Sequence, residues 1–162
     1  MKPVFLLIVI FLCSLSCKQK FKHYGERVIT MNQTRPINEL KELVLKKGDI
    51  AAYDELSIAY LNEKYLAEYL LYSIIMADKY NYPRAYFQVY HCLTYAYKFN
   101  LHSEFDEDTK NLALKYLKMG AELRDPESME HLGNLYLVGK YVPKDTILGK
   151  KLEEEGRKLC GF

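Results

Sequence analysis

The chain has 162 residues and a formal net charge of +2, which sets it apart from the strongly basic proteins that bind nucleic acids. Hydrophobic residues make up 49% of the sequence, and fifteen tyrosines occur beside no tryptophan. This composition can build a hydrophobic core and excludes an intrinsically disordered chain, and the length fits one domain of ordinary size.

The first sixteen residues have the pattern of an export signal. Lys2 precedes an uninterrupted apolar run over 4–12, which is too short to span a bilayer because a spanning helix needs roughly 20 residues. Ser16 and Cys17 follow, and the sequence then turns polar and basic. This arrangement resembles a bacterial lipoprotein signal peptide, in which a small residue precedes a cysteine that receives diacylglycerol and becomes the new N-terminus.

The resemblance implies that Cys17 is lipidated and that the protein is anchored to a membrane of the bacterial cell envelope, on its periplasmic or outer-membrane face. An uncleaved N-terminal anchor and ordinary secretion are the alternatives, and all three place the chain outside the cytoplasm. Residues 17–36 would then be a flexible tether. Cys92 lies within a helical pattern and Cys160 near the C-terminus, so we expect two unpaired thiols, although export would permit a disulfide.

From Ile37 onward the apolar periodicity is helical, and residues 37–48 predict a single capping helix. Beyond it the sequence repeats, with a small, an apolar and a large residue at successive intervals of four. The recurring positions are Ala52, Leu56 and Tyr60, then Ala85, Val89 and Leu93, then Ser128, Leu132 and Tyr136. We therefore expect three helical hairpins, over about 50–80, 83–122 and 126–160.

Glycines in the last unit predict where its helices meet and end. Gly133 interrupts a helical pattern at a cost of up to about 1 kcal/mol, which closer packing of a second helix would offset. Gly149 and Gly156 share one side of the following helix. Gly139 predicts the end of the first helix, because a left-handed cap conformation favours glycine, and Asp145 predicts the N-cap of the second.

The last unit resembles the Sel-one-like repeat, a tetratricopeptide-related α/α hairpin. The family pattern is small-x-x-x-Leu-Gly-x-x-Tyr-x-x-Gly, followed by a Val-x-x-Asp turn. The matching residues are Ser128, Leu132, Gly133, Tyr136, Gly139, Val142 and Asp145. Ser57 and Tyr90 replace the glycine in the first two units. The resemblance implies an all-α fold, a short right-handed α/α solenoid of about three helical hairpins with an N-terminal capping helix.

Tyrosines in the middle unit offer a candidate partner-binding surface. The stripe consists of Tyr82, Tyr86, Tyr90 and Tyr97, which recur at helical spacings. First helices line the concave surface of superhelical arrays, where tyrosine supplies a large contact area. The alternative is that these rings fill the core between units. His131 and Asn134 would extend the surface from the last unit.

Sequence motifs of catalysis and metal binding are absent. The histidines have no ligand partner at helical spacing, and the acidic cluster at 106–108 is better explained as a helix N-terminus than as a calcium site. We expect no cofactor, no small-molecule substrate and no nucleic-acid ligand. The sequence thus predicts a non-enzymatic module that binds an envelope protein or peptide. The alternative is an inhibitor or immunity-type protein that blocks an extracytoplasmic enzyme.

Overall fold

The computed structural model describes residues 35–60, 66–98 and 106–161, and the side chains of 96–98 are outside the description. The regular elements in these ranges are all helices: α2 (Ile37–Lys47), α3 (Ile50–Ala59), α4 (Leu66–Asp78), α5 (Pro83–Lys98), α6 (Glu107–Glu122), α7 (Pro126–Val138) and α8 (Thr146–Cys160). The all-α prediction is confirmed. The predicted signal peptide, the lipidation site at Cys17 and nearly all of the tether lie outside the described residues.

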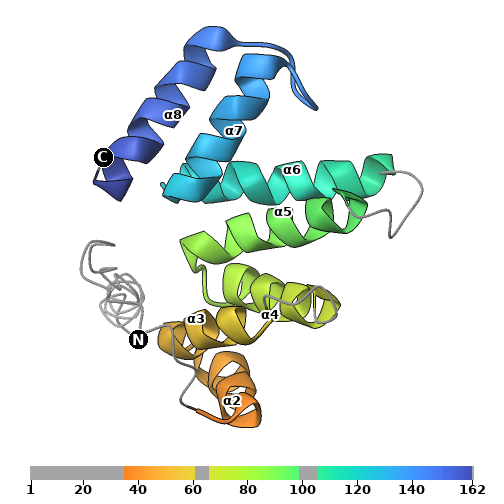
Figure 1. Ribbon diagram of the computed structural model, residues 1–162, viewed down its shortest axis with the longest axis vertical. Helices are drawn as coiled ribbons and strands as arrows, with labels where there is room; N and C mark the ends of the chain where they lie inside the picture. Colours follow the sequence, from red (N-terminus) through yellow and green to blue (C-terminus); the bar gives the residue numbers. More distant parts are fainter. Residues whose placement is uncertain (1–34, 61–65, 99–105, 162) are drawn as a thin grey trace, which may run out of the picture.

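The helices stack along the long axis of the molecule, from α2 at one end to α7 and α8 at the other (Figure 1). Each helix packs on the next in sequence, and α5 also contacts α7. The pairs α3–α4, α5–α6 and α7–α8 fall within the three predicted units. None of the described helices combines the length and the apolarity that crossing a bilayer requires.

Three of the turns between helices share one backbone geometry. Each contains a residue with positive φ, and these are Gly48 at 60°, Asn81 at 50° and Arg124 at 62°. The next helix begins two residues later, at Ile50, Pro83 and Pro126 respectively. A left-handed residue at a helix end lets the following N–H reach back to a carbonyl of the last turn. The N–H groups of Asp49, Tyr82 and Asp125 do so, at 3.4, 3.0 and 3.0 Å.

Aspartate side chains cap several of the helices. Asp145 Oδ1 accepts hydrogen bonds from the N–H groups of Ile147 and Leu148, at 3.1 and 2.9 Å. Asp106 accepts one from Thr109 N–H at 2.8 Å. Gly139 ends α7 with a φ of 73°. The predicted caps at Gly139 and Asp145, and the cap reading of the acidic cluster, are confirmed.

The core has two parts. The part between α2 and α5 is rich in tyrosine, and Tyr53 at its centre is 1% exposed. Its ring stacks on Tyr69 with centroids 5.6 Å apart, and its hydroxyl bonds Ser73 Oγ at 2.8 Å. The part between α5 and α8 is built mainly from aliphatic side chains, with Leu117 fully buried.

The backbones of α7 and α8 touch at glycine. A Cβ atom on Gly133 would lie 2.8 Å from the carbonyl oxygen of Gly149, and a Cβ atom on Gly149 would lie 2.8 Å from that of Gly133. Two turns further along each helix, a Cβ atom on Gly156 would lie 3.0 Å from the carbonyl oxygen of Pro126. Real Cβ atoms do not come this close to backbone, so the predicted close crossing at Gly133 is confirmed.

Candidate interaction surface

The tyrosine stripe of α5 lies inside the molecule. Tyr82, Tyr86 and Tyr90 are 4%, 3% and 8% exposed. Tyr82 meets the ring of Tyr53 edge-on at 5.8 Å, and the Tyr86 hydroxyl donates to Asn81 Oδ1 at 3.0 Å. Helices pack against α5 on more than one side, so the stripe faces a neighbour and not solvent. These three rings fill the core, which was the alternative, and are not exposed as the predicted partner-binding surface requires; the side chain of Tyr97 lies outside the described residues.

The residues that mark the repeat in the sequence are packing residues. Those buried in the structure are Ala52, Leu56, Tyr60, Ala85, Val89, Ser128, Leu132 and Gly133. Leu93 and Tyr136 are half-buried against the second part of the core. The small residues stand where helices are closest: a Cβ atom on Gly120 of α6 would clash with the Ser128 side chain of α7.

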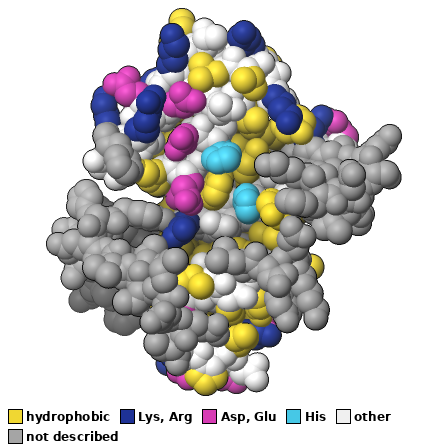
Figure 2. All heavy atoms as spheres, in the orientation of Figure 1, with side chains coloured by type: hydrophobic (Ala, Val, Ile, Leu, Met, Phe, Trp, Pro, Cys, Tyr) yellow, Lys and Arg dark blue, Asp and Glu magenta, His cyan; other side chains and the backbone are white. Residues whose placement is uncertain are grey.

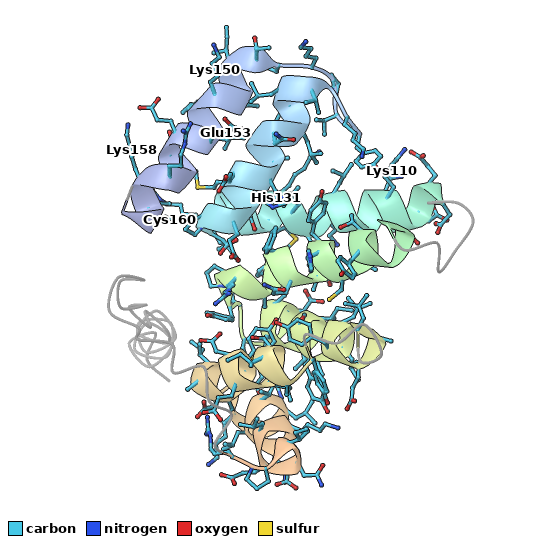
Figure 3. All side chains as sticks on the ribbon, in the orientation of Figure 1. Lys110, His131, Lys150, Glu153, Lys158 and Cys160 are labelled. Atoms are coloured by element: carbon cyan, nitrogen blue, oxygen red, sulfur yellow. The ribbon has the colours of Figure 1, made fainter. Side chains whose placement is uncertain are left out.

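Polar and aromatic side chains of α5 and α7 form an accessible face. His131 and Asn134 are exposed on α7, and His91 and Tyr95 are half-buried on α5. The His131 ring lies 4.8 Å from Phe87 between centroids. We call this surface the α5–α7 face, consisting of His91, Tyr95, Glu127, Glu130, His131 and Asn134. Figure 3 shows His131 on α7 above α5.

Ring contacts hold the centre of this face together. Phe87 lies 6.0 Å from His91 as well as 4.8 Å from His131, between centroids. His91 lies 5.2 Å from Tyr95, and His131 meets Tyr90 nearly edge-on at 6.1 Å. Phe87 and Tyr90 are buried, so they support the two histidine rings from the core side.

Acidic side chains line one edge of the face. Glu127 and Glu130 belong to α7, and the Glu127 side chain is 44% exposed. Arg84, at the start of α5, lies 3.5 Å from Glu127 and 4.0 Å from Asp54 of α3. Partial burial raises the pKa of Glu127 despite the opposing effect of Arg84. In Figure 2 the histidines lie in the middle of this face, between acidic side chains and hydrophobic ones.

The imidazole of His131 favours its neutral form. Packing against the neighbouring rings removes water from part of the side chain and lowers its pKa, while the negative charge of Glu130 opposes that shift. A neutral imidazole carries one donor and one acceptor nitrogen. His131 can therefore both donate a hydrogen bond to a bound partner and accept one from it.

A buried carboxylate fixes the start of α7 beneath the face. Asp125 is 1% exposed, and its Oδ2 accepts hydrogen bonds from Ser128 N–H and Oγ at 2.8 and 2.7 Å. Burial raises the pKa of Asp125, against these bonds and the charge of Arg84. The cap orients the first turn of α7, on which Glu127 lies.

Metal binding and disulfide formation have no support among the described residues. Within them, no three His, Cys, Asp or Glu side chains converge as a metal site requires. Cys92 and Cys160 are unpaired, as expected. Burial raises the pKa of the Cys92 thiol to about 12, so this sulfur stays protonated and unreactive near neutral pH.

The sequence predicted a role in binding for His131 and Asn134, which are exposed on α7, but singled out neither His91 nor Tyr95 of α5. His91 lies six residues after Ala85, and Asn134 lies six residues after Ser128. Because each residue lies six positions after the small residue of its predicted unit, this spacing could have placed His91 and Asn134 on the same face of α5 and α7. Compared with known proteins, the chain matches no protein-family model, no curated protein and no solved structure.

Proposed function

We propose that this protein is a non-enzymatic interaction module, held at a bacterial envelope membrane by a lipid on Cys17, that binds a protein or peptide segment on the α5–α7 face. The observation that carries the proposal is the α5–α7 face itself. Side chains from two successive first helices come together there, accessible on one side and fixed from below by Phe87.

The finer architecture belongs to the same proposal. We infer a short right-handed solenoid of Sel-one-like hairpins, with α2 as its N-terminal cap. Its support is the turn geometry shared at Gly48, Asn81 and Arg124, together with the contact between α5 and α7. Repeating turns and stacked first helices are what a repeat array needs, because each unit buries its apolar side only against the next.

The chemistry of the face indicates the kind of segment it binds. Glu127 and Glu130 provide negative charge at one edge, which suits a lysine or arginine of the partner. His91, Tyr95 and His131 present ring surface that an aromatic or guanidinium group can cover. Asn134 offers an amide that matches the hydrogen-bonding groups of an extended backbone. We therefore propose a basic, extended segment of an envelope protein as the ligand.

Site-specific photo-crosslinking tests this function in native membranes. A photoreactive amino acid replaces Asn134 in the full chain, and in a control it replaces Lys118, which is exposed on α6. We expect a crosslinked protein from position 134 and none from 118. The Glu130→Lys substitution should abolish the product, whereas Glu122→Lys, a charge reversal at an exposed site on α6, should retain it.

The outcomes separate a binding face from a structural surface. An identical crosslinking pattern from both positions, or a product that survives Glu130→Lys in a folded variant, would refute the α5–α7 face as the binding site. The anchor is tested independently by Cys17→Ser, which should abolish labelling by radioactive palmitate and release the chain from the membrane fraction.

A further inference from the structure

The turn that joins α7 to α8 exposes apolar side chains at one end of the molecule. Val138, Tyr141 and Ile147 are 58%, 41% and 84% exposed. Ile147 lies in the first turn of α8 and belongs to neither part of the core of the described residues. Three large apolar residues within ten positions are therefore exposed in one segment, and exposed apolar side chains that gather in this way commonly mark an interaction site.

Exposed lysines lie close to these apolar residues in the sequence. The exposed lysines of the turn and of the start of α8 are Lys140, Lys144, Lys150 and Lys151. The one acid between 138 and 151 is Asp145, so four positive charges and one negative charge give this segment a net charge of +3. Asp145 is engaged as the cap of α8. We call the segment 138–151 the basic tip; Figure 3 labels Lys150 within it.

The basic tip is held in one conformation. Val142 is 8% exposed and belongs to the core. Asp145 N–H donates to the carbonyl of Tyr136 at 3.0 Å, and Lys140 N–H donates to that of Leu135 at 3.1 Å. These contacts fix the turn on α7, so its outward side chains are displayed on a rigid base.

Tyr141 has an unfavourable backbone conformation at the centre of the tip. Its φ is 63°, in the left-handed region that L-residues other than glycine and asparagine rarely adopt. The ring is exposed, with Lys140 Nζ 4.9 Å from its centroid. Backbone strain of this kind commonly accompanies a functional role.

We propose that the basic tip rests on an anionic lipid surface. Tyrosine favours the boundary between headgroups and acyl chains. Val138 and Ile147 would enter that boundary, while the lysine ammonium groups remain at the level of the lipid phosphates. A bilayer fits this tip better than an acidic protein does, because the apolar side chains project from a turn at the edge of the molecule and line no groove.

The proposal adds a second membrane contact to the proposed lipid on Cys17 and does not depend on the α5–α7 face. The tip and α2, which follows the tether, lie at opposite ends of the stack (Figure 1). The tip would therefore touch the lipid at the end of the domain away from the tether.

Tryptophan fluorescence of the full chain tests the proposal, because the natural sequence has no tryptophan. The reporter variants are Tyr141→Trp and Ile147→Trp, the second at an ordinary helical position. The control is Ile37→Trp, at the opposite end and 38% exposed. Vesicles contain phosphatidylcholine alone or phosphatidylcholine with phosphatidylglycerol. We expect anionic vesicles to shift the emission of both reporters to the blue, and brominated acyl chains to quench them.

Neutral vesicles and the control at position 37 should give no shift, and Lys140→Gln with Lys144→Gln should weaken the shift of the reporters. Equal spectra on both kinds of vesicle, or an equal shift at position 37, would overturn the proposal. A shift caused by soluble polyglutamate and not by anionic vesicles would also overturn it, and would identify an acidic protein as the partner. Crosslinking from Asn134 is a separate readout, so failure of one proposal leaves the other testable.

Discussion

The first and last hairpins of this domain keep their helices together by different means. In α7–α8 the two backbones touch, with Gly133 facing Gly149. In α3–α4 aromatic rings stand between the helices: Tyr53 stacks on Tyr69 at 5.6 Å, and Tyr60 stacks on Tyr72 at 6.3 Å. The contact between two successive helices therefore rests on close backbone approach in one place and on large buried side chains in the other.

The difference begins at a single position of the pattern predicted from the sequence. Gly133 of α7 corresponds to Ser57 of α3, whose hydroxyl donates to the carbonyl of Asp54 in its own helix at 2.6 Å. A glycine contact depends on shape, so one added methyl group disturbs it. A ring contact depends on buried apolar area and on bonds such as that of Tyr53 to Ser73. The two hairpins should therefore fail under different substitutions.

The largest effect is expected at the tyrosine contact. Tyr53→Ala removes a side chain that is 1% exposed and should lower the free energy of unfolding by about 4 kcal/mol, as for other large aromatic truncations in a core. Urea denaturation followed by circular dichroism measures it. Tyr53→Phe keeps the ring and loses the bond to Ser73, so its cost should be about 1 kcal/mol. Similar costs for the two variants would show that the hydroxyl, not the ring, holds this hairpin.

The glycine contact should be the next most sensitive. Gly133→Ala places a methyl group 2.8 Å from the Gly149 carbonyl oxygen, and the resulting strain should cost about 2 kcal/mol after the gain in helix propensity. Asn134→Ala is the matched control, because it lies one residue further on the exposed side of α7; it should change stability by less than about 0.5 kcal/mol. A Gly133→Ala variant as stable as the natural chain would mean that α8 can shift without loss.

The helix caps should not distinguish the two hairpins. Asp49 accepts a hydrogen bond from Ala52 N–H at 2.8 Å at the start of α3, and Asp145 caps α8 in the same way. Each change to alanine should cost about 1 kcal/mol, read from the urea midpoint. Nearly equal costs would place the difference between the hairpins at the helix crossings. A cost several-fold larger at one cap would instead place it at the helix ends.

The smallest effect is expected from pH. The pKa of His131 lies below its usual value in the folded chain, so between that value and about 6.5 the unfolded chain binds more protons. The free energy of unfolding should therefore rise with pH across this window. The contribution of His131 is fully present above the unfolded pKa and is lost as the pH falls through the folded pKa. Burial raises the pKa of Tyr53 and Tyr69, so these two buried tyrosines of the first hairpin contribute no slope near neutrality.

His131→Phe keeps a ring on Phe87 and removes the titrating group. The variant should lose the His131 part of the slope between pH 5 and 7.5. Asp125 and Glu127, whose pKa values are raised by burial, titrate in both proteins and cancel in the comparison. Parallel stability curves for the two proteins would show that His131 ionises as freely in the folded chain as in the unfolded one.

Local chemistry made much of the fold predictable. Gly139 and Asp145 could be assigned from sequence because caps depend on a few neighbouring residues. Gly133 could be assigned because a glycine within a helical pattern needs a packing reason. The helical character of the described ranges followed from apolar periodicity, which does not require knowledge of the neighbours.

The surface was harder to predict because burial depends on distant parts of the chain. The spacing of Tyr82, Tyr86 and Tyr90 defines one side of a helix, but not whether a neighbour covers it. The ring partners of His131 on α5 are brought to it by the packing of α5 against α7. The left-handed conformation of Tyr141 is set by the contacts of its turn, since the residue type alone argues against it.

The three turns that contain Gly48, Asn81 and Arg124 share one geometry, and this geometry affects how such a chain can change length. A duplicated copy of residues 83–125, inserted after Asp125, would start behind one of these turns and end in another. Its first helix would meet the same kind of junction that precedes Pro83 and Pro126 now. A gene duplication of this segment would thus create no new type of junction, and the surface of first helices could grow by one unit at a time.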